Sequence, residues 1–254
     1  FHRYTADEHT LRCIDILDSL THDEDPKKQH FRKIFQEFED PVAIYIALIM
    51  HDTGRAEEVR HHEDASAILA SQVCRRLNYT GDRLRLIIFL VDHHLTFFKT
   101  ATKMDISDPE TIADFAAAVK NPTWLKALHL FTYVDSNGTN DEAWTDWKAS
   151  LMSQLYNSTN AYLRDRKSFE KQFKRPLEEA KAKVLTKVPE SYAEEVEAHF
   201  ASMPARYFRH RGSTSIARHV KLFHKFFKLV HRTTNESLIP ILHWETRSDE
   251  GYSL

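Results

Sequence analysis

The chain has 254 residues, carries a formal net charge of −2, and 42% of its residues are hydrophobic. This length allows one large domain, or one domain with an appendage, and the composition allows a sizeable buried core. Because positive and negative charges nearly balance, the chain lacks a strong overall field that would attract nucleic acid or an acidic membrane surface. The longest apolar run, 42–50, is too short to cross a bilayer. We therefore expect no nucleic-acid partner and no membrane.

Secretion and a disulfide framework are also not expected. The N-terminus lacks a basic region followed by an apolar core, so no secretory signal is visible. The two cysteines, Cys13 and Cys74, lie in apolar or helical surroundings. This placement predicts buried free thiols and a cytoplasmic protein. Because the sequence does not begin with Met, we expect a fragment of a longer protein.

The first third of the chain predicts helices, because only five of its 254 residues are Gly. Leu11, Ile14 and Leu17 share one face of a helix that begins near Asp7. A polar loop follows over 21–30, then a short helix over 31–38. The uniformly apolar segment 42–50 predicts a fully buried central helix, although its length alone does not exclude a buried strand.

The remainder of the chain continues the helical pattern. Segment 42–50 leads into His51-Asp52-Thr53-Gly54, where Gly54 is expected to end the helix. Residues 55–62 are charged and predict a loop. Further helices are predicted over 64–77, 82–95, 110–119, 123–135 and 144–163, with a loop over 99–109 and a break over 136–140. Segment 164–200 predicts charged peripheral helices interrupted by Pro176 and Pro189, 201–232 another helix, and 238–254 some strand character.

These elements predict an all-α protein with negligible sheet, and its histidines are the unusual feature, at sixteen. His51-Asp52 follows the most apolar helix, where burying a carboxylate is costly without a compensating charge. A divalent cation supplies that charge, and imidazole with carboxylate suits Zn, Fe or Mn. As an isolated pair, His51-Asp52 is equally explained as a helix C-cap. Further candidate ligands lie near predicted helix ends and can converge in a helical bundle: His9, His62, His94 and Asp135.

The order His9, His51-Asp52, Asp135 resembles the HD superfamily of metal-dependent phosphohydrolases. Stretches 4–11, 51–55, 105–110 and 144–151 resemble the HD region of bacterial PII uridylyltransferase/uridylyl-removing enzymes. The most specific of them is Trp-Thr-Asp-Trp-Lys-Ala-Ser-Leu at 144–151. Two later stretches, 203–208 and 240–254, resemble that family's connector to its C-terminal ACT domains. The resemblance implies an HD-domain helical bundle with additional C-terminal helices.

The resemblance also implies a set of site residues. His9, His51, Asp52 and Asp135 match the core metal ligands. His62 and His94 match residues that would hold a second ion, with Asp52 bridging. The cofactor is then one or two divalent ions per site, of Mn, Mg, Fe or Zn. Catalytic roles fall on Asp52, Arg55, His62 and His94. Arg55 stands where the family usually has Lys, and it keeps the positive charge for binding phosphate.

The implied organisation has three parts: an HD domain over 1–165, a helical connector over 166–237, and the start of an ACT-type region over 238–254. The implied partners are a uridylylated PII signalling protein, together with nucleotidyltransferase and ACT domains that would lie outside this chain. The implied reaction is metal-dependent hydrolysis that removes UMP from PII, as part of nitrogen regulation.

Two alternative functions stay open: an HD-type hydrolase of free nucleotides, and a non-catalytic scaffold of a multidomain uridylyltransferase. We also interpret Trp144 and Trp147 as core anchors. His61 and His93 are read as neighbours of the site. The histidines of the C-terminal part are interpreted as a surface or interface feature: His210, His219, His224 and His231.

Overall fold

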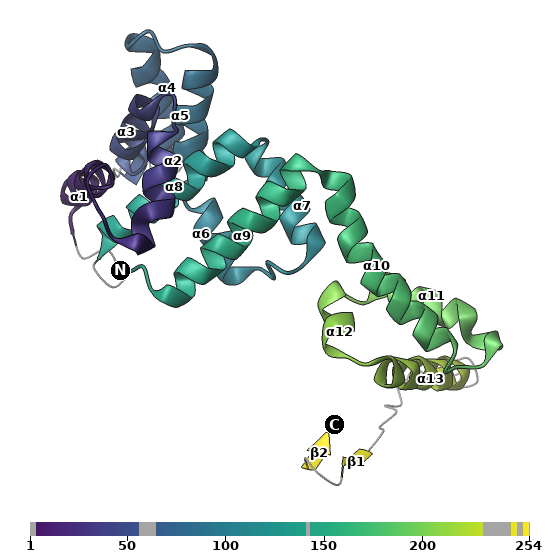
Figure 1. Cartoon of the computed structure of the whole chain (residues 1–254). Coiled ribbons are helices and arrows are strands. Elements are labelled where there is room, and N and C mark those ends of the chain that lie inside the picture. Colours follow the sequence, from purple (N-terminus) through teal and green to yellow (C-terminus); the bar gives the residue numbers. More distant parts are fainter. Residues whose placement is uncertain (1–3, 56–64, 141–142, 231–244, 248–250, 254) are drawn as a thin grey trace. The chain divides into compact units, whose positions relative to one another are not determined.

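The computed structural model describes residues 4–55, 65–140, 143–230, 245–247 and 251–253 (Figure 1). Most of these residues lie in helices. The strands of the described part are β1 (Glu245–Arg247) and β2 (Gly251–Ser253), which pair antiparallel with Glu245 opposite Ser253. The prediction of an all-α fold with negligible sheet is therefore confirmed. No described helix combines the length and apolar character needed to span a membrane.

Backbone contacts divide the chain into two units, Phe1–Phe169 and Glu170–Leu254. The sequence placed the first division after residue 165. The helices of the first unit are, in chain order, α1 (Ala6–Ser19), η1 (Pro26–Lys28), α2 (Gln29–Gln36), α3 (Pro41–Met50), η2 (Thr53–Arg55), α4 (Ala65–Arg76), α5 (Gly81–His93), α6 (Thr96–Lys103), α7 (Pro109–Val119), α8 (Pro122–Thr139) and α9 (Asp146–Arg164).

Helix α8 is the centre of the first unit. It contacts α1, α2, α3, α5, α6, α7 and α9. Its buried residues run from Leu125 to Val134 with few gaps, so it is enclosed on all sides rather than along one stripe. Asn121 caps its start by accepting a hydrogen bond from the Trp124 backbone N–H at 2.9 Å. Because α8 is enclosed by so many neighbours, it fixes the position of every side chain it carries.

Helix α3 differs from its prediction. It is a helix, not a strand, and it packs mainly against α5. Ala43, Ile44 and Leu48 are fully buried, but Val42 and Ile49 are 45% and 50% exposed. The expectation of burial on all sides was wrong, because residues seven apart share one face and no described element covers that face here. Hydrophobicity alone does not report how many neighbours surround a helix.

Three predicted interruptions are helical in the structure. Residues 96–103 form α6, whose Phe97 and Ala101 are buried one turn apart. The expected break over 136–140 is the last turn of α8, where Asn137 Nδ2 donates to the Tyr133 carbonyl at 2.7 Å. Pro176 lies inside α10 (Arg166–Leu185). Local turn propensity was overridden by packing in the first two cases.

The second unit is built around its own core. It contains most of α10, followed by η4 (Glu190–Tyr192), α11 (Ala193–Ser202), α12 (Ala205–His210) and α13 (Ser213–Val230). Its core residues come from four helices: Val184, Val196, Phe200, Phe208, Ile216, Ala217 and Val220.

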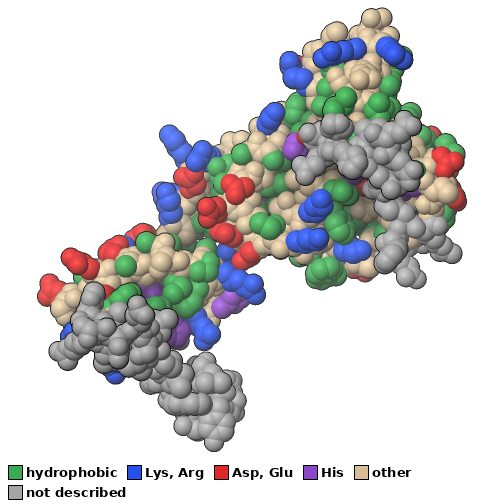
Figure 2. All heavy atoms as spheres, turned by 180° about the vertical axis from the view of Figure 1, so that it is seen from behind, with side chains coloured by type: hydrophobic (Ala, Val, Ile, Leu, Met, Phe, Trp, Pro, Cys, Tyr) green, Lys and Arg blue, Asp and Glu red, His purple; other side chains and the backbone are tan. Residues whose placement is uncertain are grey.

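Acidic and basic side chains share the face seen in Figure 2, as expected from a net charge near zero.

Several aromatic and histidine interpretations need correction. Trp144 packs against Tyr133, with ring centroids 5.1 Å apart, but Trp147 is 63% exposed and is not a core anchor. His219 and His224 are not simple surface groups. His219 Nδ1 lies 2.6 Å from Tyr207 Oη, and His224 Nδ1 lies 2.6 Å from Glu195 Oε1. His210 is exposed, and His231 lies outside the described residues.

One buried histidine belongs to the core and not to the site. His129 on α8 is stacked between Phe97 and Tyr156, with centroid distances of 5.0 and 4.6 Å. It is fully buried, and neither ring nitrogen has a hydrogen-bond partner among the residues that the structure describes. Burial, and to a lesser degree the nearby charge of His30, lowers the pKa of His129 to about 3. The ring is therefore neutral at physiological pH.

His129→Phe should make the protein less sensitive to acid. The folded protein holds the His129 pKa near 3 against 6.5 in the unfolded chain, so the unfolded state binds the extra proton and stability falls as pH drops below 6.5. Between pH 8 and pH 5, this one group lowers the free energy of unfolding by about 2 kcal/mol. Urea unfolding at both pH values should show that the Phe variant, which keeps an aromatic ring, avoids this loss. The exposed His22→Gln variant is the control, and equal acid sensitivity of wild type and His129→Phe would contradict the expectation.

Candidate metal centre

The centre begins at the C-terminal end of α3. His51 is the C-cap residue of this helix, and Asp52 follows it. His51 and Asp52 are only 2% and 7% exposed. The next turn is held in place because the Gly54 N–H donates to Ser66 Oγ on α4 at 2.8 Å. A Cβ on Gly54 would lie 2.4 Å from the Ser66 backbone N. Gly54 is thus needed for close approach to α4, beyond its predicted role in ending the helix.

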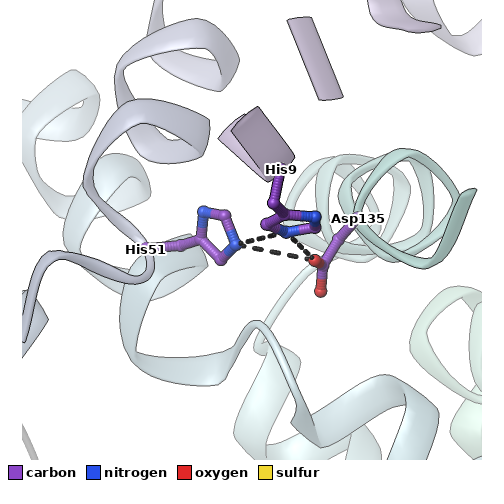
Figure 3. Close-up of side chains that lie close together, drawn as sticks. All are labelled: His9, His51 and Asp135. Carbon is purple, nitrogen blue, oxygen red and sulfur yellow. Dashed lines mark hydrogen bonds and ion pairs between the residues drawn. The ribbon is translucent and has the colours of Figure 1, made fainter. Parts of the chain in front are cut away.

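Two further ligand-type residues reach the same point from other helices. His9 lies in the first turns of α1, and Asp135 lies in α8, one turn before its end. His9 Nε2 is 3.0 Å from Asp135 Oδ1 and 3.2 Å from His51 Nε2. His51 Nε2 is 3.5 Å from Asp135 Oδ1. Figure 3 shows the three side chains pointing toward one another from three separate elements.

These distances suit a single cation. Donor atoms bound about 2.1 Å from one ion lie about 3.0 to 3.4 Å apart at octahedral and tetrahedral angles. The observed separations of 3.0, 3.2 and 3.5 Å fall close to this range. Among the described residues, His9, His51 and Asp135 are the group whose ligand atoms all lie within 4.8 Å of one another.

The histidine rings are oriented with Nε2 toward this point. His51 Nδ1 donates to the Leu48 carbonyl, and His94 Nδ1 donates to the Val91 carbonyl, each at 2.7 Å. The ring of His9 donates to the backbone of Gly138. A backbone acceptor on Nδ1 fixes the tautomer in which Nε2 carries the free lone pair, and this arrangement is common among metal-binding histidines.

Asp52 and His94 lie beside the three-residue group. Asp52 Oδ2 is 3.6 Å from His51 Nε2, and Asp52 Oδ1 is 3.9 Å from His94 Nε2. His94 Nε2 is buried, and within the described part of the chain it has no hydrogen-bond partner. An orphaned buried nitrogen next to a carboxylate is costly unless something binds it. This pair of contacts fits an additional ligand or a second cation, with Asp52 between the two positions.

The helix ends add to the negative potential. His51 and His94 are the C-cap residues of α3 and α5. The C-terminal end of a helix carries a partial negative charge from its unpaired carbonyls, and this charge favours cations. Two helix C-termini and the carboxylates of Asp52 and Asp135 therefore converge in one buried region.

The pKa values of His9 and His51 are both raised by the neighbouring carboxylate. Burial lowers the pKa of His9, but its hydrogen bonds to Asp135 and Cys13 outweigh burial and raise the pKa to about 10. Burial also opposes ionisation of His51, yet the hydrogen bond and charge of Asp135 raise its pKa. Because the two Nε2 atoms are 3.2 Å apart, only one of them can hold a proton between them. Protons on these rings balance Asp135, and a cation would balance it equally well.

The pKa values of Asp135 and His94 shift in the opposite direction. Burial raises the pKa of Asp135, but hydrogen bonds from His51 and His9 outweigh burial and hold the pKa well below its usual range. Burial lowers the pKa of His94, which is therefore a neutral imidazole at pH 7. A neutral imidazole can bind a cation or accept a proton.

The structure describes the other predicted site residues only in part. Arg55 is the last residue of η2, and only its backbone is described. His62 and His61 lie outside the described residues. His93 is one-third exposed, and its Nε2 lies 3.7 Å from Asp92 Oδ2, so it is a neighbour of the group and not part of it.

Sequence reasoning missed two residues that contact His9. Cys13 Sγ lies 3.6 Å from His9 Nε2, and Gly138 sits against both Cys13 and the His9 ring. Helical spacing could have identified them. Cys13 follows His9 by four residues, and Gly138 follows Asp135 by three, so each lies on the same helix face as a ligand.

Comparisons with known proteins find similar sequences among curated enzymes. The chain is 38% identical over 165 residues to a bifunctional uridylyltransferase/uridylyl-removing enzyme of Methylococcus capsulatus, a match of 65% of this chain and 19% of that protein. It is 39% identical over 165 residues to the enzyme of the same name from Stutzerimonas stutzeri, covering 65% and 18%. The corresponding Caulobacter vibrioides protein is 35% identical over 168 residues, covering 65% and 17%.

The chain thus spans less than a fifth of the length of these curated relatives. No solved structure matches it significantly. The family model of the HD domain matches residues 6–121, which include His9, His51, Asp52 and His94. Residues 6–121 of this chain are thus similar to the HD domain family.

Proposed function

We propose that this chain is a metal-dependent phosphohydrolase that cleaves a phosphodiester, and that its substrate is UMP attached to a PII signalling protein. The observation that carries the proposal is the convergence of His9 Nε2, His51 Nε2 and Asp135 Oδ1 within 3.5 Å, next to Asp52. The match to the HD domain supports hydrolysis of a phosphate ester. The similarity to uridylyl-removing enzymes supports the choice of substrate.

Some of these residues would hold the ion, and others would act on the substrate. His9, His51, Asp52 and Asp135 would hold a divalent cation, of Mn, Mg, Fe or Zn. Such an ion, when bound, lowers the pKa of water and offsets charge on phosphate oxygens. The hydrogen bond from His51 Nδ1 to the Leu48 carbonyl would leave Nε2 of this ring free to bind such an ion.

His94 and Arg55 would act closer to the substrate. His94 is neutral at pH 7, and its Nε2 faces Asp52. It can therefore hold a second ion or accept a proton from the attacking water. His62 is proposed for the same pair of roles by its match to the family. Arg55, at the end of η2, would bind a phosphate oxygen and stabilise charge in the transition state.

Asp52→Ala should abolish stoichiometric metal. The carboxylate of Asp52 is buried beside His51 and His94, so its loss removes charge that compensates a cation at this position. Elemental analysis of the purified protein gives the measurement. Asp146→Ala removes a carboxylate that is 89% exposed and serves as the control. If Asp52→Ala retains the metal content of wild type, the ligand assignment is wrong.

Hydrolysis should depend on metal and on the His51-Asp52 pair. Two substrates separate chemistry from recognition: uridylylated PII, and a small aryl phosphodiester such as bis(p-nitrophenyl) phosphate. Wild type loaded with Mn or Mg should release UMP from the first, and the His51→Ala/Asp52→Ala variant should not. If only the small ester is cleaved, the assignment as a hydrolase stands, and uridylylated PII is rejected as a substrate of this chain on its own. If a metal-loaded chain cleaves neither, the non-catalytic scaffold becomes the better description.

Arg55→Ala should lower turnover several-fold or more while metal content stays unchanged. The reason is that the guanidinium would stabilise charge on the substrate and does not contact the ion. Steady-state kinetics on the small ester, combined with elemental analysis, gives both readouts. Arg85→Ala, which removes a surface guanidinium paired with Asp82, is the matched control. Unchanged kinetics in Arg55→Ala would make Arg55 an ordinary loop charge.

A further inference from the structure

Two small residues pack behind the His9 ring and face each other across the contact between α1 and α8. Cys13 lies one turn after His9 on α1, and Gly138 lies one turn after Asp135 on α8. The helices therefore meet through two contacts in register: His9 with Asp135, and Cys13 with Gly138. Residues three or four apart on a helix share a face, so both contacts lie on the same pair of faces.

The second contact leaves no free space. A Cβ built on Gly138 would lie 2.4 Å from Cys13 Sγ, and 3.3 Å from both Cε1 and Nδ1 of His9. The first distance is far below any normal contact between carbon and sulfur. Cys13 is 0% exposed, so its thiol has no solvent to move into. Gly in a helix also costs about 1 kcal/mol relative to Ala, so its presence here needs a packing reason.

Both residues contact the His9 ring. Cys13 Sγ lies 3.8 Å from His9 Nδ1 and 3.6 Å from Nε2. The backbone of Gly138 accepts a hydrogen bond from the same ring. The ring is thus held between a buried thiol on α1 and the backbone of α8. Its Nε2 is left directed at His51 and Asp135.

We propose that Gly138 and Cys13 are positioning residues that set the orientation of His9 in the metal centre by close packing of α1 on α8. This inference rests on the proposed metal-dependent function. Ligand atoms must be held within about 0.5 Å of their working positions. A methyl group on Gly138 would have to displace the thiol, the ring or the whole of α1. Displacement of the ring or of α1 would move His9 Nε2 away from the other two ligand atoms, and displacement of the thiol would change its contact with the ring.

The test adds volume at Gly138, removes volume at Cys13, and measures the affinity of each protein for the metal ion alone. Four proteins are titrated with Mn²⁺ and with Co²⁺: wild type, Gly138→Ala, Cys13→Ala and the double variant. Gly138→Ala should weaken binding by about 10- to 100-fold, the range seen when groups that orient a ligand are altered. Cys13→Ala removes the sulfur, so the double variant has room for the new methyl group. It should regain affinity to within a few-fold of Cys13→Ala.

Two further measurements separate orientation of the ligand from general damage. The visible absorption of bound Co²⁺ reports its ligand geometry, so Gly138→Ala should shift this spectrum and the double variant should restore it. Gly212→Ala is the matched control, because a Cβ on Gly212 meets nothing within 4 Å. If Gly138→Ala does not fold, Cys13→Val tests the same contact from α1, since it adds a methyl group facing Gly138, and it should weaken binding as well.

The outcomes distinguish this proposal from the one on which it rests. If wild type takes up neither ion, the metal-dependent function fails, and the positioning role fails with it. If wild type binds metal and Gly138→Ala binds it equally well with an unchanged Co²⁺ spectrum, only the positioning role is overturned. Loss of affinity that the double variant does not recover would also overturn it, because the damage would then come from the Gly138 backbone and not from crowding at Cys13.

Discussion

The structure of the centre depends on burying most of one carboxylate, that of Asp135, one turn before the end of α8. Its Oδ1 lies 3.0 Å from His9 Nε2 and 3.5 Å from His51 Nε2. An isolated carboxylate in this position would cost far more free energy than one helix contact provides. The two imidazoles are therefore required partners, and each comes from a different element. Meeting this requirement fixes where α1 and the end of α3 lie against α8.

The helices supply the remaining electrostatics through their ends. Enclosure of α8 by its neighbours keeps Asp135 in one position, while α3 and α5 end at His51 and His94. Backbone carbonyls within the last turn of these two helices accept the Nδ1 protons, and this sets both tautomers. The same carbonyls add negative potential around the ligand atoms. The same backbone carbonyls thus orient the histidine side chains and favour a cation beside them.

The chemistry proposed belongs to the first unit. Every described residue with a role in it lies between His9 and Gly138, within Phe1–Phe169. The second unit folds around its own apolar core, and His219 and His224 in it bond to Tyr207 and Glu195. Among its described residues, no group of histidines and carboxylates has ligand atoms as close together as those of the centre.

The sequence by itself determined the helical class, because apolar spacing is a local property, and it determined the ligand types through the order His9, His51-Asp52, Asp135. It misplaced α6, the last turn of α8 and the continuity of α10 at Pro176, because turn propensity is also local and tertiary packing overrode it in α6 and α8. It could not separate Trp144 from Trp147, since nearby residues of the same type differ only in the direction they face. Only the tertiary structure decided that Cys13 and Gly138 meet behind His9, because that contact joins residues 125 positions apart and depends on the distance between two helix axes.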